Sequence, residues 1–248
     1  MIKQVVYFIN FCAEVLVQFR KIIRRGHVGI AVLQKQILFT GIDAFTIISL
    51  TALVIGGLII IQGNTIFVNL GNSSIIYTVL VSVVTRELGT FIPALIIVAR
   101  SGTAITTELG NMVVNNEINA LTSMGISPVG YLVVPRIAGV VLSVLPLSVY
   151  FNIIALLAAG AVYQVFYDVI FLDFIFNLAA EIELNDILII LIKSVVFGYT
   201  IALLACFHGL QVMVASTEVP QRTSKAVVHS IASVIVFDII ITVIFYFM

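Results

Sequence analysis

The sequence is poor in the residues that soluble catalytic domains use. It has no tryptophan, two cysteines, three histidines, and only 10% charged residues among 248. Cys12 and Cys206 are far apart in apolar surroundings, which excludes a disulfide framework or a C-x-x-C site. His208 lies two residues after Cys206, but no further ligand follows at metal-binding spacing. We therefore expect no metal site.

The motifs of the common catalytic classes are also missing. The sequence contains no G-x-x-x-x-G-K-[ST] phosphate loop, no H-E-x-x-H and no supported Ser/His/Asp set. Twelve basic and twelve acidic residues cancel, so net charge gives no sign of a nucleic-acid partner. We expect no catalytic residues, no cofactor and no enzymatic activity in this chain.

Apolar residues dominate what is present. They make up 61% of the chain and give a mean hydropathy of +1.23, which predicts an all-α integral membrane protein. A spanning helix needs about 20 apolar residues. Five segments qualify: 43–68, 75–99, 132–165, 187–207 and 227–247. The third is long enough to overshoot the bilayer or to bend at Pro135 or Pro146.

The charges between these segments predict the orientation. The connection 62–77 has no charge, and 166–186 is acidic with no Lys or Arg. Basic residues gather in the N-terminal arm and in the other two connections: Lys3, Arg20, Lys21, Arg24, Arg25, Lys35, Arg100, Arg136, Arg222 and Lys225. By the positive-inside rule, the N-terminus is cytoplasmic and the C-terminus lies outside.

In the first 25 residues, apolar and polar residues alternate with the periodicity of a helix. Apolar residues such as Phe8, Val15 and Phe19 share one stripe, while Glu14 and Lys21 belong to the other. This pattern favours an amphipathic helix in the membrane interface, although a helix packed on its own protein would look similar. We divide the chain into an N-terminal interfacial arm, 1–40, and a transmembrane domain, 41–248.

The connection 100–136 is long for a loop and contains a short amphipathic segment, Asn115 to Met124. Ile118, Leu121 and Met124 are spaced to share one face of a helix. The pattern alone fits two structures equally. The helix offers its surface to a cytoplasmic partner, or it folds back against its own bundle.

Four charges fall deep inside the apolar segments, away from their ends: Arg86, Glu87, Lys193 and Asp238. At 1.5 Å per residue, Arg86 lies about 16 Å from the outer end of its span, and the others reach overlapping depths. An unpaired charge there costs about 2.5–3.5 kcal/mol or more, so we expect one cluster of partners. Neighbours on a helix point about 100° apart, so Arg86 and Glu87 need separate partners. The cluster either only locks helices together or borders a cavity for an amphipathic ligand.

Three motifs carry a family resemblance: R-E-L-G, A-R-S-G-T-A-I-T-T-E-L-G and E-I-N-A-L-T-S-M-G-I-S-P, all between residues 86 and 128. With LIKSVVFGYTIALLACFHG and SKAVVHSIASVIVFD, they resemble the MlaE/YrbE permeases of lipid ABC transporters. The resemblance extends from about residue 34 to the C-terminus. One departure is Thr90, where the family often has proline; here Pro93 follows three residues later.

The resemblance implies a homodimer in a bacterial inner membrane, with a plastid inner envelope as the second choice. It implies a cytoplasmic ABC ATPase dimer, an extracytoplasmic MCE-domain protein, phospholipid as the transported molecule, and room for a small STAS-like cytoplasmic subunit. Asn115 to Gly125 would be the coupling helix that docks on the ATPase. The residues assigned to coupling are Glu108, Asn116, Glu117, Ala120, Leu121, Met124 and Gly125.

The resemblance also implies a lipid cavity at the dimer axis. Span one between Ile59 and Leu70, including Phe67, and span two at Glu87 and Leu88 would line it. Two other functions remain open from the residues alone. An ion- or proton-coupled carrier would use the intramembrane charges as a relay, and a scaffold subunit would only anchor partners. A carrier is disfavoured because no matched internal repeat is visible.

Overall fold

The computed structural model describes residues 2–25, 30–69, 75–213 and 215–247, without the side chains of 2–5, 22–25 and 66–69. These described residues form helices and contain no strand, which confirms the all-α prediction. The α-helices and π-helical segments (η) are α1 (Ile2–Arg25), α2 (Ile30–Ile37), η1 (Leu38–Ile42), α3 (Phe45–Asn69), α4 (Ile75–Leu80), η2 (Val81–Leu88), α5 (Gly89–Ile97), η3 (Val98–Gly102), α6 (Thr103–Val114), α7 (Glu117–Ser123), η4 (Val129–Val133), α8 (Val134–Tyr167), α9 (Phe171–Glu181), α10 (Leu184–Leu210) and α11 (Glu218–Tyr246).

Several of these elements run on from one another, and five continuous segments are long and apolar enough to cross a membrane. They are Ile30–Thr65, Ile75–Val114, Val129–Tyr167, Leu184–Leu210 and Glu218–Tyr246. The predicted number is therefore confirmed, but each helical segment extends beyond its predicted apolar run at one or both ends. The backbone continues as helix through polar residues because helical hydrogen bonds satisfy its N–H and C=O groups. The predicted boundary between residues 40 and 41 falls inside the first segment.

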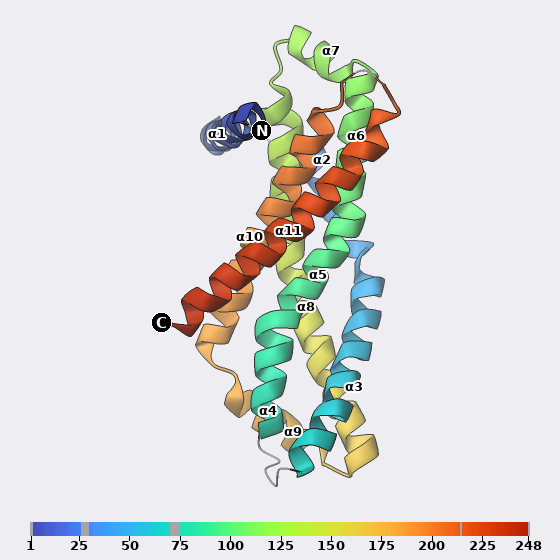
Figure 1. Ribbon diagram of the computed structural model, residues 1–248, viewed down its shortest axis with the longest axis vertical. Coiled ribbons are helices and arrows are strands. Elements are labelled where there is room, and N and C mark those ends of the chain that lie inside the picture. The colour runs from blue at the N-terminus through green and yellow to red at the C-terminus, as the bar shows by residue number, and fades with distance from the viewer. Residues whose placement is uncertain (1, 26–29, 70–74, 214, 248) are drawn as a thin grey trace.

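The spans form a tall bundle, in which α11 crosses the others diagonally (Figure 1). Helix α8 runs through Pro146 for 34 residues, about 51 Å at 1.5 Å per residue, so it exceeds a hydrocarbon core about 30 Å thick. Pro135 lies where the π-helical segment η4 passes into α8, so its missing N–H falls at the junction of the two. The helix α6 continues to Val114, so the connection predicted over 100–136 contains only a short non-spanning stretch around α7.

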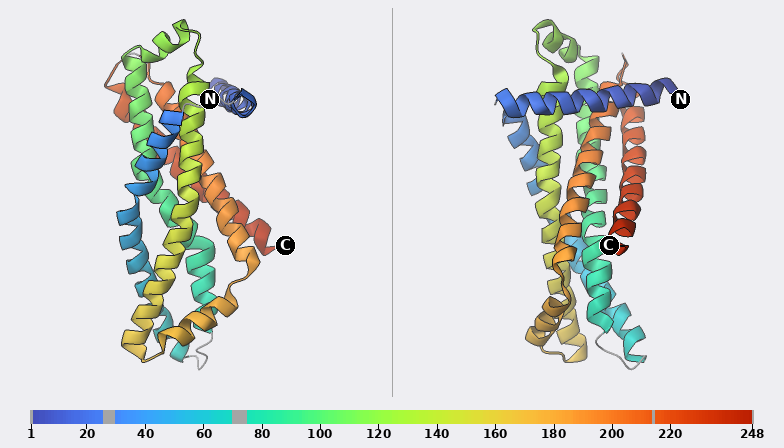
Figure 2. Two further views of the ribbon diagram at one scale, coloured as in Figure 1. Left: turned by 180° about the vertical axis from the view of Figure 1, so that it is seen from behind. Right: turned by 90° about the vertical axis from the view of Figure 1, so that its left-hand side faces the viewer.

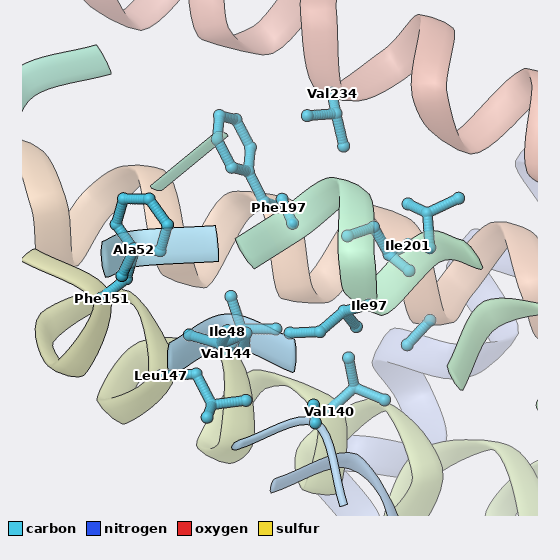
Figure 3. Packing of buried hydrophobic residues seen from close by; sticks show 14 of the residues in the cluster. Ile48, Ala52, Ile97, Val140, Val144, Leu147, Phe151, Phe197, Ile201 and Val234 are labelled. Atoms are coloured by element: carbon cyan, nitrogen blue, oxygen red, sulfur yellow. The ribbon is translucent and has the colours of Figure 1, made fainter. Parts of the chain in front are cut away.

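The core lies where α3, α5 and α10 meet the central helix α8, and α11 packs on α10 (Figure 3). Phe151 on α8 and Phe197 on α10 are fully buried there. Gly56 on α3 permits a backbone contact with α8, because a Cβ at this position would lie 2.0 Å from the carbonyl oxygen of Ala155. Small residues allow such close helix approach in membrane proteins, where packing replaces the hydrophobic effect.

Helix α1 lies crosswise over one end of the bundle (Figure 2). The Phe8 ring meets the Phe207 ring edge-on, with 4.9 Å between centroids. Val15 is buried against the bundle, whereas Leu16 and Val17 are exposed. One side of this helix therefore packs on the protein, and apolar residues of its other side are exposed.

Candidate functional site

The segment η2 places Arg86 and Glu87 inside the bundle. A π-helical turn widens the backbone by one residue and is frequent at functional sites. Here it precedes α5, whose Pro93 cannot donate a backbone hydrogen bond. Gly89 follows directly, and a Cβ there would lie 2.2 Å from the side chain of Asn152 on α8. The glycine thus lets the start of α5 approach the central helix just after the two charged residues.

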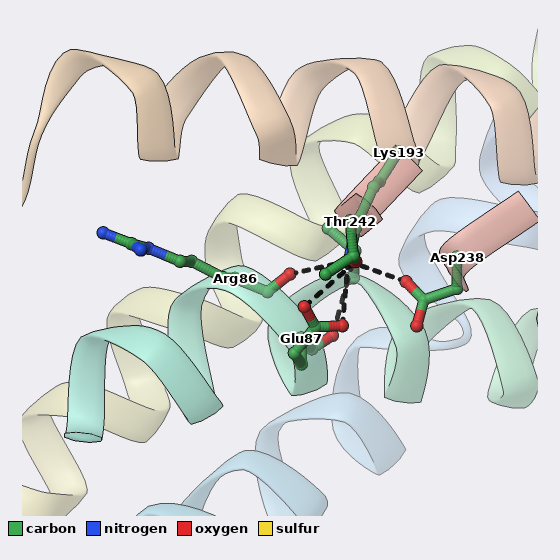
Figure 4. Close-up of polar contacts among 6 residues, drawn as sticks. Arg86, Glu87, Lys193, Asp238 and Thr242 are labelled. Atoms are coloured by element: carbon green, nitrogen blue, oxygen red, sulfur yellow. Dashed lines mark hydrogen bonds and ion pairs between the residues drawn. The ribbon is translucent and has the colours of Figure 1, made fainter. Parts of the chain in front are cut away.

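Lys193 on α10 is fully buried and lies at the centre of the charged residues. Its Nζ donates to Glu87 Oε2 at 2.9 Å and to the Arg86 carbonyl oxygen at 2.9 Å. The same atom forms an ion pair with Asp238 Oδ1 on α11 at 2.8 Å. Two hydrogen bonds and one further ion pair thus converge on this ammonium. Three spans therefore meet at one buried cation (Figure 4).

The cluster around Lys193 has two carboxyl groups for one ammonium. Thr242, one turn beyond Asp238 on α11, donates its hydroxyl to Glu87 Oε1 at 3.0 Å. The Glu87 side chain is 38% exposed and that of Asp238 is 17% exposed, whereas Lys193 is inaccessible. We call Glu87, Lys193, Asp238 and Thr242 the acid–lysine cluster. Its acidic side is therefore partly exposed at the surface of the chain.

The side chain of Arg86 points away from this cluster (Figure 4). Its Nε pairs with Asp186 Oδ1 at 2.6 Å, and the Asp186 side chain is 1% exposed. Asp186 also accepts a hydrogen bond from the backbone N–H of Glu183, closing a capping box at the start of α10. The single cluster expected for four charges is therefore two adjacent groups. The sequence places Asp186 in the acidic connection 166–186. Its position three residues after Glu183 is the spacing of a capping box, and this signal marks it as part of the start of α10.

The residues assigned to the lipid cavity lie on separate elements. Ile59 on α3 is half-buried against the core, and Glu87 and Leu88 on η2 are also half-buried. Leu70 and the side chain of Phe67 lie outside the described residues. The resemblance places this cavity at a dimer axis, between two copies of the chain.

The residues assigned to ATPase coupling gather mostly on α7, at the same end of the bundle as α1 (Figure 1). Asn116 precedes the helix at φ 60° and Gly125 follows it at φ 74°, two left-handed positions that turn the chain sharply at both ends. Leu121 packs half-buried against the core. The outward positions are exposed: Asn116, Glu117, Ala120, Met124 and Gly125. One face of α7 therefore packs against its own bundle, and the other face is exposed.

Glu108 differs from the other residues assigned to coupling. It lies on α6, and its Oε2 pairs at 3.1 Å with the guanidinium of Arg136, a side chain that is 4% exposed. Both residues line a cavity of about 440 Å³ between α2, α6 and α8, together with Lys35 and Gln36. Glu108 thus neutralises a buried cation within its own chain.

Comparisons with known proteins agree on one family. The Permease MlaE family profile matches residues 33–244. A probable ABC transporter permease protein of Rickettsia typhi is 28% identical over 86% of this chain and 82% of its own length. The intermembrane phospholipid transport system permease protein MlaE of Haemophilus influenzae is 28% identical over 90% and 85%. A probable ABC transporter permease protein of Pyropia yezoensis is 30% identical over 96% and 90%.

The profile covers all five membrane-spanning segments except the first few residues of the first and the last few of the fifth. The relatives are named as transporter permeases, in agreement with a transport role for this chain and against a role as an enzyme. The acid–lysine cluster, the Arg86–Asp186 pair and α7 all fall within the matched residues. The chain belongs to the MlaE permease family.

Proposed function

We propose that this chain is the membrane permease of an ATP-driven transporter that moves phospholipid between a bacterial inner membrane and an extracytoplasmic MCE-domain protein. The family match over residues 33–244 is the observation that carries this proposal. A relative named for intermembrane phospholipid transport supports phospholipid as the substrate class. The protein itself binds no nucleotide in this proposal, and ATP hydrolysis belongs to a partner.

The chain is oriented with its N-terminus in the cytoplasm and its C-terminus outside. The uneven distribution of charge supports this orientation. α1, with Arg20 and Lys21, and α7 share one end of the bundle (Figure 2). α9 and the start of α10 form the opposite end, with Asp173, Glu181 and Glu183. The basic end faces the cytoplasm and the acidic end faces outward.

The exposed face of α7 docks on a cytoplasmic ATPase dimer. Glu117 and Met124 give this face one charge and one large apolar side chain, and the chain turns sharply at the left-handed residues at either end of the helix. Two copies of the permease form a dimer, and α3 and η2 of each line a lipid cavity at its axis. ATP binding moves the two copies as rigid bodies through α7. A small STAS-like subunit can join the cytoplasmic side.

The proposal is tested by purifying the chain from native membranes with its bound partners and identifying the proteins and lipids by mass spectrometry. The expected result is an ATPase and an MCE-domain protein in fixed ratio with two permease chains, together with phospholipid. A stable complex that contains neither partner, or one with no phospholipid above the level of an unrelated membrane protein, overturns it.

The acid–lysine cluster supports a second candidate, a proton-coupled carrier. Two carboxyl groups flank Lys193, one of them more than a third exposed, and intramembrane carboxyl groups are typical of proton relays. Such a carrier works without an ATPase and stops when the proton gradient is abolished. The dependence on ATP therefore separates the two functions.

A further inference from the structure

A groove runs between α1 and the bundle, separate from the acid–lysine cluster. It has a volume of about 690 Å³, within the range of small-molecule sites. Leu16 and Phe19 of α1 form one wall. Leu142 of α8, Val195 of α10 and Phe237 of α11 contribute to the other side. Each of these five side chains is more than a third exposed, so the groove is open toward its surroundings.

The groove is preformed because α1 is fixed to the bundle at two places. The Phe8 ring packs on Phe207, as described above. Ten residues further along the helix, the Gln18 amide donates to the Ser127 hydroxyl at 3.2 Å. A Cβ at Gly130 would lie 3.3 Å from Gln18, so α1 approaches η4 closely at this point. Helix α1 therefore forms a fixed wall of the groove.

The walls of the groove are suited to a hydrocarbon. Thr200 is a polar residue in the lining, and its hydroxyl donates to the Val196 carbonyl oxygen of its own helix at 2.9 Å. It therefore offers no free hydrogen-bond donor to an occupant. Water gains little in such a space, because a buried water needs polar partners. In a membrane protein the available apolar occupant is an acyl chain.

Positive charge lies beside one wall of the groove. Arg20 and Lys21 directly follow Phe19, and both are exposed and have no ion pair with any residue that the structure describes. Arg20 shares its helix face with Leu16, four residues earlier. Long basic side chains extend their charged ends to the membrane surface while their stems remain on apolar residues. This arrangement complements a phosphate above an inserted chain.

We propose that the groove beside α1 binds an anionic phospholipid, with an acyl chain between α1 and helices α8, α10 and α11, and its phosphate at Arg20 and Lys21. This lipid occupies the leaflet in which α1 lies. The site is separate from the proposed transport cavity at the dimer axis and requires only that the chain resides in a membrane. If the proposed lipid transport is overturned, the proposed lipid site beside α1 is not affected.

The chain has no tryptophan, so one introduced indole reports on one place. The full chain carrying Phe19→Trp is reconstituted in phosphatidylcholine vesicles that contain increasing fractions of brominated phosphatidylglycerol or brominated phosphatidylcholine. Bromine on the acyl chain quenches a neighbouring indole. Val6→Trp is the matched control, because Val6 is exposed on the same helix but does not line the groove. We expect saturable quenching of the indole in Phe19→Trp, half-complete at a mole fraction at least threefold lower for phosphatidylglycerol than for phosphatidylcholine.

Two further changes, each made in the Phe19→Trp chain, identify the source of the preference. Arg20→Gln combined with Lys21→Gln is expected to remove the threefold preference for phosphatidylglycerol. Ala138→Phe fills the groove and is expected to remove the saturable part of the quenching. Val149→Phe, on the same helix, is the control and leaves both the preference and the saturable quenching unchanged. Quenching that rises linearly with either lipid and matches the Val6→Trp control means ordinary surrounding lipid and overturns the proposal. Absence of quenching in the Phe19→Trp chain means that protein covers the groove and overturns it as well.

Discussion

The ammonium of Lys193 lies 2.9 Å from the carboxylate of Glu87, and this pair joins the fourth span to the second deep inside the bundle. Asp238 of the fifth span approaches the same ammonium at 2.8 Å. The second acid changes what a substitution at Glu87 is expected to do. If Glu87 loses its charge, Lys193 still has a carboxylate partner.

We expect Glu87→Gln and Asp238→Asn, made singly, to lower stability by about 1 kcal/mol, the net value of one hydrogen bond. The double variant leaves a buried ammonium without a counter-charge, which costs about 3–5 kcal/mol. Adding Lys193→Met to the double variant restores much of that loss. Yield and melting temperature in detergent measure this series. Additive losses in the double variant would contradict a shared role of the two acids.

The lipid-cavity proposal predicts a different result at the neighbouring residue. Leu88 is half-buried on η2, and Leu88→Trp adds bulk where the two protomers are proposed to enclose lipid. We expect co-purified phospholipid and transport to fall at least tenfold while the dimer and its ATPase still assemble. Leu157→Trp, on an exposed position of α8, is the matched control. Normal lipid content in the Leu88→Trp complex would place the cavity elsewhere.

Much of this architecture could be predicted from composition and periodicity. Five apolar segments predicted five spans, because a bilayer tolerates only helices with internally satisfied backbones. The ends were predicted less well. Residues 100–114 contain Arg100 and Glu108, which interrupt the apolar run, yet the helix continues through them as η3 and α6. Their charges are neutralised by Asp43 and Arg136, contacts that no local pattern contains.

Cysteine labelling tests the proposed orientation. Asn177 on α9 and Asn116 before α7 are both exposed at opposite ends of the bundle. In intact cells, Asn177→Cys reacts with a membrane-impermeant maleimide, and Asn116→Cys reacts only after the membrane is opened. Burial raises the pKa of the Cys12 thiol, which slows its reaction, and Cys206 is buried. Replacing Cys12 and Cys206 removes background labelling from the native cysteines. The opposite labelling pattern would show that the orientation is the reverse of the one proposed.

The exposed face of α7 predicts a defect that is specific to coupling. Glu117→Lys reverses a charge at an exposed position, so we expect a change in stability below about 0.5 kcal/mol. The ATPase, however, detaches from the permease or no longer responds to lipid. Asp173→Lys on the exposed surface of α9 is the control, since it makes the same reversal at the opposite end. An intact complex with normal lipid-stimulated ATP hydrolysis in Glu117→Lys would remove α7 from the interface.

The candidate site shows where prediction from sequence ends. Counting residues from the span ends put Glu87, Lys193 and Asp238 at overlapping depths, because a helix rises by a fixed 1.5 Å per residue. Depth alone does not say which way a side chain points. Arg86 has the same depth, but its guanidinium turns to Asp186, a residue that the sequence assigned to the outer connection. The rotation of each helix depends on packing against its neighbours, which depth does not determine.

We propose that a partner's ATP hydrolysis drives lipid movement through this permease. The complete complex, reconstituted in liposomes with a fluorescent phospholipid, tests it by the rate at which label passes to the extracytoplasmic partner. We predict transfer that requires ATP and a hydrolysis-competent ATPase, and that continues when an ionophore abolishes the proton gradient. Transfer that continues without the ATPase and stops when the gradient is abolished would contradict the account and identify a carrier.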